Sequence, residues 1–115
     1  MRTIGNTSVD GEVRAVASGA LANGDTVIVN ADGTVSVVGG GNLTSENYIG
    51  IAKGAAADGT SAVVQTGCSI NDAQSGLTAG QDYYVQTDGT LGLTAADPSV
   101  LAGTAVSATK IIVKG

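Results

Sequence analysis

Residues 26–38, TVIVNADGTVSVV, contain the pattern that decides the fold. Apolar residues alternate with other residues on both sides of a central Ala-Asp-Gly. An Asp-Gly pair between two such runs is a strong short-range signal for a β-hairpin. Aspartate can hydrogen-bond to its own backbone, and glycine takes a positive φ without steric cost. We therefore expect a type I turn that is closed by Gly33 in the left-handed region.

The same pattern of a turn followed by a strand occurs three times. ADGTVSVV at 31–38 is followed by ADGTSAVV at 57–64 and TDGTLGLT at 87–94. Each copy offers one aspartate beside Ala or Thr, whereas calcium loops place carboxylates at alternating positions, so we expect no metal site. Each copy is expected to reverse the chain within an antiparallel sheet. The predicted structural turn residues are Asp32, Gly33, Asp58, Gly59, Asp88 and Gly89.

A longer repeat contains two of these copies. Residues 21–38 align without gaps with residues 77–94, and each copy is followed by a short apolar segment with a central glycine and then by a final strand. The chain is therefore predicted to be all-β, with eight to ten short antiparallel strands and little helix, as a small barrel or two-sheet sandwich. The predicted β domain, 21–115, consists of two related halves, 21–67 and 77–115. Residues 1–20 are expected to form a separate arm or hairpin that adds a strand to a neighbouring subunit, so that their deletion leaves the rest folded.

The composition predicts a thin core. The 115 residues contain no Phe or Trp, and Val, Ala, Leu and Ile supply most of the apolar content of 43%. A small chain without large rings gains stability from association, so we expect a homo-oligomer. The formal charge of −5, with five scattered basic residues, argues against binding to nucleic acid. No apolar run is long enough to span a membrane, and no membrane partner is expected.

Catalytic residues are scarce in this sequence. Histidine is absent, which removes the common nucleophile–base systems and the usual zinc sites. The single cysteine, Cys68, has no neighbouring base and is expected to be a small apolar core residue. The aspartates lie at or beside turns, where they usually bond backbone amides. We therefore expect no enzymatic activity, no catalytic residue and no cofactor.

Tyr83 and Tyr84 form the only aromatic pair. Neighbouring residues on a strand point to opposite faces, so one ring is expected inside and the other outside. The inner ring would fill the core, and the outer one is a candidate for contact with another subunit, because tyrosine is enriched at interfaces.

Several stretches resemble known virion proteins. GLTAGQDYYVQTDGTLGLT (76–94) and PSVLAGTAVSATKIIVKG (98–115) are similar to segments of fibre-type and small surface proteins of tailed bacteriophages, particularly marine and cyanobacterial phages. LANGDTVIVNADGTV (21–35) and YIGIAKGAAADGTSAVVQTG (48–67) resemble segments of small capsid decoration proteins. The shared motifs are turn residues and strand patterns, and they include no catalytic residue.

The resemblance implies a structural role on a virus particle. It implies a capsid decoration or cement protein, made in the host cytoplasm and located on the capsid surface of the virion. Such a protein binds the lattice of the major capsid protein and commonly associates as a trimer. The alternative is a tail or head fibre domain that binds a receptor or glycan on the host surface. A short chain that begins at Met1 favours the decoration protein.

Overall fold

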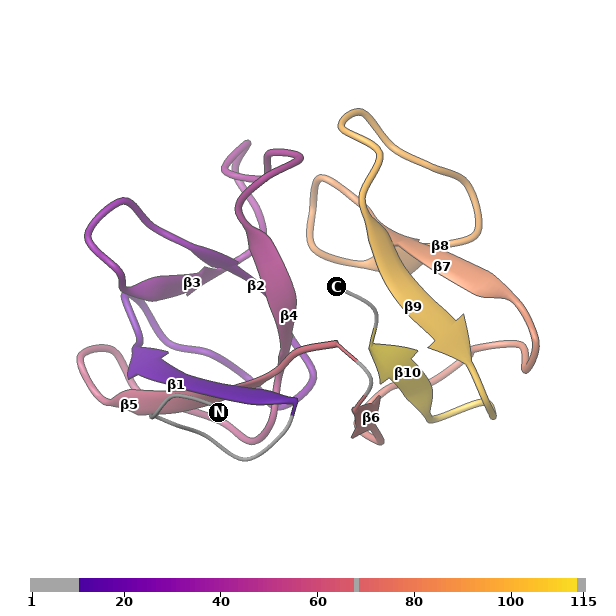
Figure 1. Cartoon of the computed structure of the whole chain (residues 1–115), viewed down its shortest axis with the longest axis horizontal. Helices are drawn as coiled ribbons and strands as arrows, with labels where there is room; N and C mark the ends of the chain where they lie inside the picture. Colours follow the sequence, from indigo (N-terminus) through magenta and orange to yellow (C-terminus); the bar gives the residue numbers. More distant parts are fainter. Residues whose placement is uncertain (1–10, 68, 114–115) are drawn as a thin grey trace, which may run out of the picture.

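The computed structural model describes residues 11–67 and 69–113, which form ten short strands and no helix. The strands make two antiparallel five-stranded sheets that lie side by side, which confirms the predicted all-β fold (Figure 1). We call residues 11–67 lobe 1 and residues 69–113 lobe 2. Lobe 1 contains β1 (Glu12–Val16), β2 (Thr26–Val29), β3 (Val35–Val37), β4 (Tyr48–Ala52) and β5 (Ser61–Gln65). Lobe 2 contains β6 (Ile70–Asn71), β7 (Asp82–Val85), β8 (Leu91–Gly92), β9 (Leu101–Ala105) and β10 (Ile111–Val113).

Strands β2 and β3 form the hairpin that the opening motif predicts. Val29 pairs with Val35, and the N–H of Gly33 donates to the carbonyl of Asn30 at 3.0 Å. Gly33 has a φ of 87°, in the left-handed region where a side chain is disfavoured. The β7–β8 hairpin repeats this turn, with a 2.9 Å bond from the N–H of Gly89 to the carbonyl of Gln86.

The two sheets have the same topology. Their strand orders are β1-β5-β4-β2-β3 and β6-β10-β9-β7-β8, so each strand of lobe 1 has a counterpart five strands later. The β2–β4 pairing shifts register between Val27 and Ile28, and the β7–β9 pairing shifts between Tyr83 and Tyr84. These pairs occupy the same places in the aligned sequences. The chain therefore contains an internal structural duplication.

One glycine in each lobe lies beside this irregularity, at a place that leaves no room for a side chain. Gly50 lies opposite Val27, and Gly103 lies opposite Tyr83. A Cβ atom on Gly50 would lie 1.9 Å from the carbonyl oxygen of Gln65, and one on Gly103 would lie 2.0 Å from that of Ile112. Real Cβ atoms do not approach backbone atoms so closely. The central glycines of the two apolar segments thus allow β4 and β9 to pack against their neighbouring strands.

The lobe boundaries differ from the predicted ones. Strand β1 pairs with β5 from Glu12 to Val16, and Ala17 is buried, so the expectation of a separate arm is wrong for this part of 1–20. Deletion of 1–20 would remove a strand of lobe 1, contrary to the expectation that the rest stays folded. Lobe 2 likewise begins with β6, which lies between the two predicted halves, 21–67 and 77–115. Residues 1–10, which are half of the predicted arm, and Cys68, the predicted core cysteine, lie outside the described residues.

The sheet of lobe 1 is strongly curled. Its two outermost strands meet, because Ala17 forms a parallel bridge with Val35 and the N–H of Ser18 donates to the Val35 carbonyl at 2.7 Å. The curled sheet encloses a small apolar cluster, the lobe 1 core. Its buried residues are Ala17, Leu21, Val27, Val35, Ala52, Ala62 and Val64.

A second cluster, the shared core, joins the lobes. Lobe 2 contributes the residues on the inner face of its sheet, and lobe 1 contributes residues from the outer face of its own sheet and the loop after β3. The lobe 2 members are Tyr83, Val85, Val100, Ala102, Ala105, Ile111 and Val113, and the lobe 1 members are Ile28, Val38, Leu43 and Ile51. Lobe 1 therefore completes the core of lobe 2.

Buried polar groups fix the contact between the lobes. Asn71, which is 1% exposed, donates to the Gln65 side chain at 2.8 Å and accepts from Ala73 N–H and the Gln74 side chain, both at 3.0 Å. The Thr26 hydroxyl donates to the carbonyl of Gly89 at 2.7 Å. Because buried polar groups are costly without partners, these bonds specify one relative position of the lobes.

Replacing Asn71 by alanine is expected to lower the free energy of unfolding by about 1–3 kcal/mol, because the buried partners lose their bonds. Urea unfolding, followed by circular dichroism, measures the change. The control is Asn23→Ala, whose exposed side chain accepts one bond from Gly54 N–H. An equal loss in both variants would contradict a special role for the buried network.

Candidate functional site

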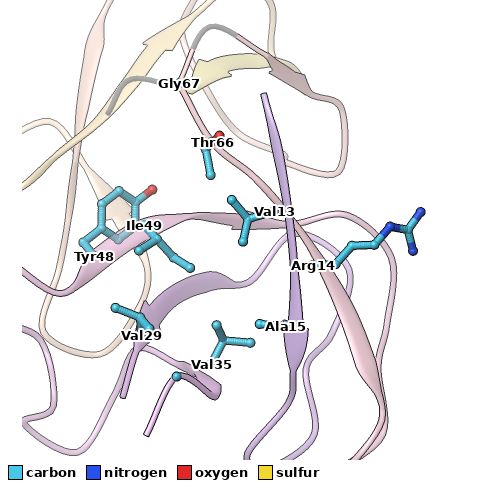
Figure 2. Close-up of a pocket in the computed structure, with 10 residues that line it drawn as sticks. Val13, Arg14, Ala15, Val29, Val35, Tyr48, Ile49, Thr66 and Gly67 are labelled. Atoms are coloured by element: carbon cyan, nitrogen blue, oxygen red, sulfur yellow. The ribbon is translucent and has the colours of Figure 1, made fainter. Parts of the chain in front are cut away.

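An apolar hollow of about 620 Å³ opens in lobe 1, between β1 and the strands of the β2–β3–β4 region (Figure 2). Figure 2 shows the side chains of Val13, Val35 and Ile49 pointing into it from three different strands. Alternation along each strand places these residues on the face that also covers the lobe 1 core. The lining residues are Val13, Arg14, Ala15, Val29, Gly33, Val35, Tyr48, Ile49, Thr66 and Gly67.

The lining is open to solvent although it is mostly aliphatic. Val13 is 41% exposed, and Val29 and Ile49 are only half-buried, whereas Val35 beneath them is 1% exposed. The guanidinium of Arg14 points away from the other lining side chains (Figure 2), so it places no charge inside the hollow. Exposed concave apolar surface of this kind is typical of a site that another molecule covers.

Tyr48 lies between the hollow and the shared core. Its ring packs against the shared core, and its hydroxyl group is buried without a hydrogen-bond partner among the described residues. Burial raises the pKa of Tyr48 far above its ordinary value, so the phenol stays protonated. A buried hydroxyl without a partner is rare in native proteins. Apart from Arg14, the polar side chains of the lining are those of Thr66 and Tyr48.

The predicted turn residues Asp32 and Asp88 have identical local bonds. Each accepts the backbone N–H of the threonine two positions later at 3.0 Å and that threonine's hydroxyl at 2.6 Å. The bonds from Thr34 and Thr90 lower the pKa of the two carboxyl groups. Both aspartates lie on the exposed tips of hairpins, where their role is structural.

This pKa shift predicts a pH-dependent stability. Because the folded pKa lies below the ordinary value of 3.8, the carboxylates stabilise the fold above that pH and lose this effect as the pH falls through the folded pKa. The double variant D32N/D88N is therefore expected to have a lower Tm than the native chain at pH 7. The difference should be smaller at about pH 2 than at pH 7, because the carboxyl groups become protonated as the pH falls. Thermal unfolding at the two pH values measures this, with Asp97→Asn as the exposed control; a difference independent of pH would contradict it.

The glycines that follow these aspartates have different surroundings. A Cβ on Gly33 would have no heavy atom within 4 Å, whereas one on Gly89 would lie 2.5 Å from the carbonyl oxygen of Val38 in lobe 1. Gly33 lines the hollow, and Gly89 is covered by the other lobe. The same turn is thus free in one lobe and in contact in the other.

The third predicted turn, Asp58-Gly59, has another role. It lies between β4 and β5, and Gly59 has a φ of 82°. The Asp58 carboxylate accepts the N–H of Gly19 at 2.8 Å, which ties the turn to the segment after β1. The structure therefore places the three Asp-Gly pairs at separate turns and does not bring their carboxylates together.

The two tyrosines on β7 have different environments. Tyr83 is 5% exposed in the shared core, and its oxygen accepts the N–H of Thr78 at 2.8 Å. Tyr83 is therefore the inner ring of the pair, so it is not the candidate for contact with another subunit. Tyr84 is half-buried on the opposite face of the sheet, where that prediction stays open.

The chain matches no protein-family model and no curated protein sequence. Within residues 11–67 and 69–113, no group of three or more side chains has the composition of a metal site. The same residues include no helix with the length and hydrophobicity needed to cross a bilayer. The similarity to phage virion proteins stays a prediction.

No local sequence pattern indicates the hollow. Its lining comes from β1 to β4 and from the end of β5, so only the fold brings these residues together. Val13 and Tyr48 have no distinctive sequence context, because a lone valine or tyrosine on a short strand is common in cores. The one available signal was the alternation of Val13 and Ala15 with charged neighbours on β1.

Proposed function

We propose that this chain is a non-enzymatic structural protein of a tailed-phage particle. Its role is that of a decoration protein, which attaches to the major capsid protein lattice on the outside of the virion and stabilises the head. The resemblance to virion proteins motivates this proposal; it covers residues 21–35, 48–67, 76–94 and 98–115. The all-β, two-lobed fold agrees with it.

The lobe 1 hollow is the observation that carries the proposal. A site for a small polar substrate holds a few convergent polar groups that orient the ligand. Here the lining is mostly aliphatic, Arg14 points outward, and the other polar side chains of the lining are those of Thr66 and Tyr48. Such a surface is suited to the apolar side chains of another protein, as in the core of a protein–protein interface.

Capsid attachment can be tested with purified heads. The chain is mixed with expanded capsids of the tailed phage that encodes it, and the particles are sedimented and imaged by cryo-electron microscopy. We expect the protein to sediment with the capsids and to add regular density on the shell. Density at the tail or at a head fibre, together with glycan-array binding, would instead support the alternative of a receptor-binding fibre domain.

A further inference from the structure

The internal duplication shows what fills the matching place in lobe 2. Val29 and Ile49, which line the hollow, align with Val85 and Ala102, and both of these are 0% exposed in the shared core. Lobe 1 covers them. The hollow of lobe 1 is therefore the counterpart of a surface that in lobe 2 is already buried by a neighbouring lobe.

Individual contacts support this correspondence. Gly33, open to solvent, aligns with Gly89, which accepts the Thr26 hydroxyl and lies against the backbone of Val38. Val13 pairs with Val64 in lobe 1, and Asn71 pairs with Ile111 in lobe 2. Because Val64 and Ile111 occupy equivalent positions in the two sheets, Val13 and Asn71 also correspond. Val13 is 41% exposed, whereas Asn71 is 1% exposed against Gln65 and Ala52 of lobe 1. At each of these positions the lobe 2 residue contacts lobe 1, whereas the corresponding residue of lobe 1 is exposed to solvent.

The face of lobe 1 that makes these contacts also has a counterpart. A row across β2, β4 and β5, formed by Thr26, Ile51 and Gln65, faces lobe 2. The counterpart row on β7, β9 and β10 faces outward from lobe 2, and it carries exposed apolar side chains beside it, with Ile70 at 51% and Leu101 at 36% exposure. We call this surface the lobe 2 outer face; its residues are Ile70, Asp82, Tyr84, Leu101, Thr104 and Ile112.

We propose that copies of this chain associate head to tail, with the lobe 2 outer face of one copy seated in the lobe 1 hollow of the next. The contact between copies then repeats the contact between the lobes within one chain. A heterologous contact of this kind forms rings when the rotation closes. The inference rests on the proposed function in one respect: it takes the hollow to be a protein-docking site, and it names a second copy as the occupant.

The residue types on the two surfaces are complementary. Within the chain, the side chains of Gln65 and Asn71 form a buried hydrogen bond of 2.8 Å. Their counterparts between copies are Ile112 and Val13, so a buried polar pair is replaced by an apolar pair. Such a joint replacement keeps the contact free of unpaired polar groups.

One position departs from this complementarity. Asp82 stands where lobe 1 has Thr26, and its carboxylate accepts a bond from the Thr104 hydroxyl. In the repeated contact it would face the carbonyl oxygen of Gly33, to which it cannot donate. The proposed contact between copies is therefore weaker than the contact between lobes at this point.

The oligomeric state of the purified chain, without capsids, tests the inference. Sedimentation velocity over a dilution series is expected to show reversible oligomers of the native chain. Val13→Glu in the hollow and Leu101→Glu on the outer face are each expected to give monomers, because each places a charge in the apolar contact. Val37→Glu, at a residue 38% exposed outside both surfaces, is the control and should leave the oligomers unchanged.

Mixing the two monomeric variants tests the head-to-tail geometry. V13E keeps an intact outer face and L101E keeps an intact hollow, so the mixture is expected to form a heterodimer through one native contact. Circular dichroism shows whether each variant folds. If V13E does not fold, Val13→Asn replaces it in the hollow, and if L101E does not fold, Ile70→Glu replaces it on the outer face. Asp82→Thr is expected to tighten association about tenfold, because it restores the donor that Thr26 supplies within the chain.

Three results would overturn the inference. They are a native chain that stays monomeric at every concentration, a variant of either surface that still forms the oligomer, and a mixture that does not form heterodimers. Because these measurements contain no capsid, they are independent of the proposed function. A monomer that binds capsids would refute self-association alone, and an oligomer that ignores capsids would refute the decoration role alone.

Discussion

Replacing Gly103 by alanine is expected to abolish stable folding of the chain at room temperature. The added methyl group would lie 2.0 Å from the carbonyl oxygen of Ile112, a backbone atom that a side-chain rotation cannot move. Relief would require β9 and β10 to separate, and these strands carry much of the shared core. The cost is expected to exceed about 4 kcal/mol, a large part of the total stability of a small domain.

The control for this substitution is Gly39→Ala. A Cβ at Gly39 would have no heavy atom within 4 Å, so its effect on stability should stay within about 0.5 kcal/mol. The circular dichroism spectrum and the midpoint of urea unfolding are measured for each variant. A G103A protein with a native-like midpoint would show that β9 adjusts at this point, and the requirement for glycine would be refuted.

Truncation of Ile51 is expected to have the second largest effect. This residue is 0% exposed and belongs to the part of lobe 1 that fills the shared core. Ile51→Ala removes three carbon atoms and leaves a cavity between the lobes, which typically costs about 2–5 kcal/mol. Because both lobes contribute to the shared core, we expect a single unfolding transition with a lower urea midpoint and an unchanged slope.

Leu93→Ala serves as the comparison for this variant. Leu93 is 56% exposed, so its truncation should cost less than about 1 kcal/mol. Urea titrations of both variants, followed by fluorescence of the tyrosines and by circular dichroism, test the expectation. Two separate transitions in I51A would indicate that the lobes unfold independently, contrary to the coupling expected from a common core.

Local chemistry predicted the hairpins correctly. The motif around Asp32-Gly33 contains its own turn and both strands, so the information lies within 13 residues, and the Asp88-Gly89 copy behaves in the same way. The central glycine of each apolar segment can also be found in the sequence, but the sequence does not show why glycine is needed there. Glycine is needed because a side chain would collide with a carbonyl oxygen of a neighbouring strand, and no local pattern reveals that contact.

Contacts between distant segments could not be predicted. Strand β1 pairs with β5, whose residues lie about 50 positions later, and nothing in EVRAV identifies that partner. The assignment of residues 12–17 to a separate arm failed for this reason. The alternation of Tyr83 and Tyr84 was predicted, but the register shift between them and the packing of lobe 1 decide which ring is buried. The hollow depends on all of these pairings.

The order of strands has a consequence for synthesis on the ribosome. In each lobe the first strand hydrogen-bonds to the last one, β1 to β5 and β6 to β10. A nascent chain therefore cannot complete either sheet until the fifth strand of that lobe has left the exit tunnel. The shared core needs strands of both lobes, so the growing polypeptide exposes the aliphatic side chains of this core until β10 has emerged.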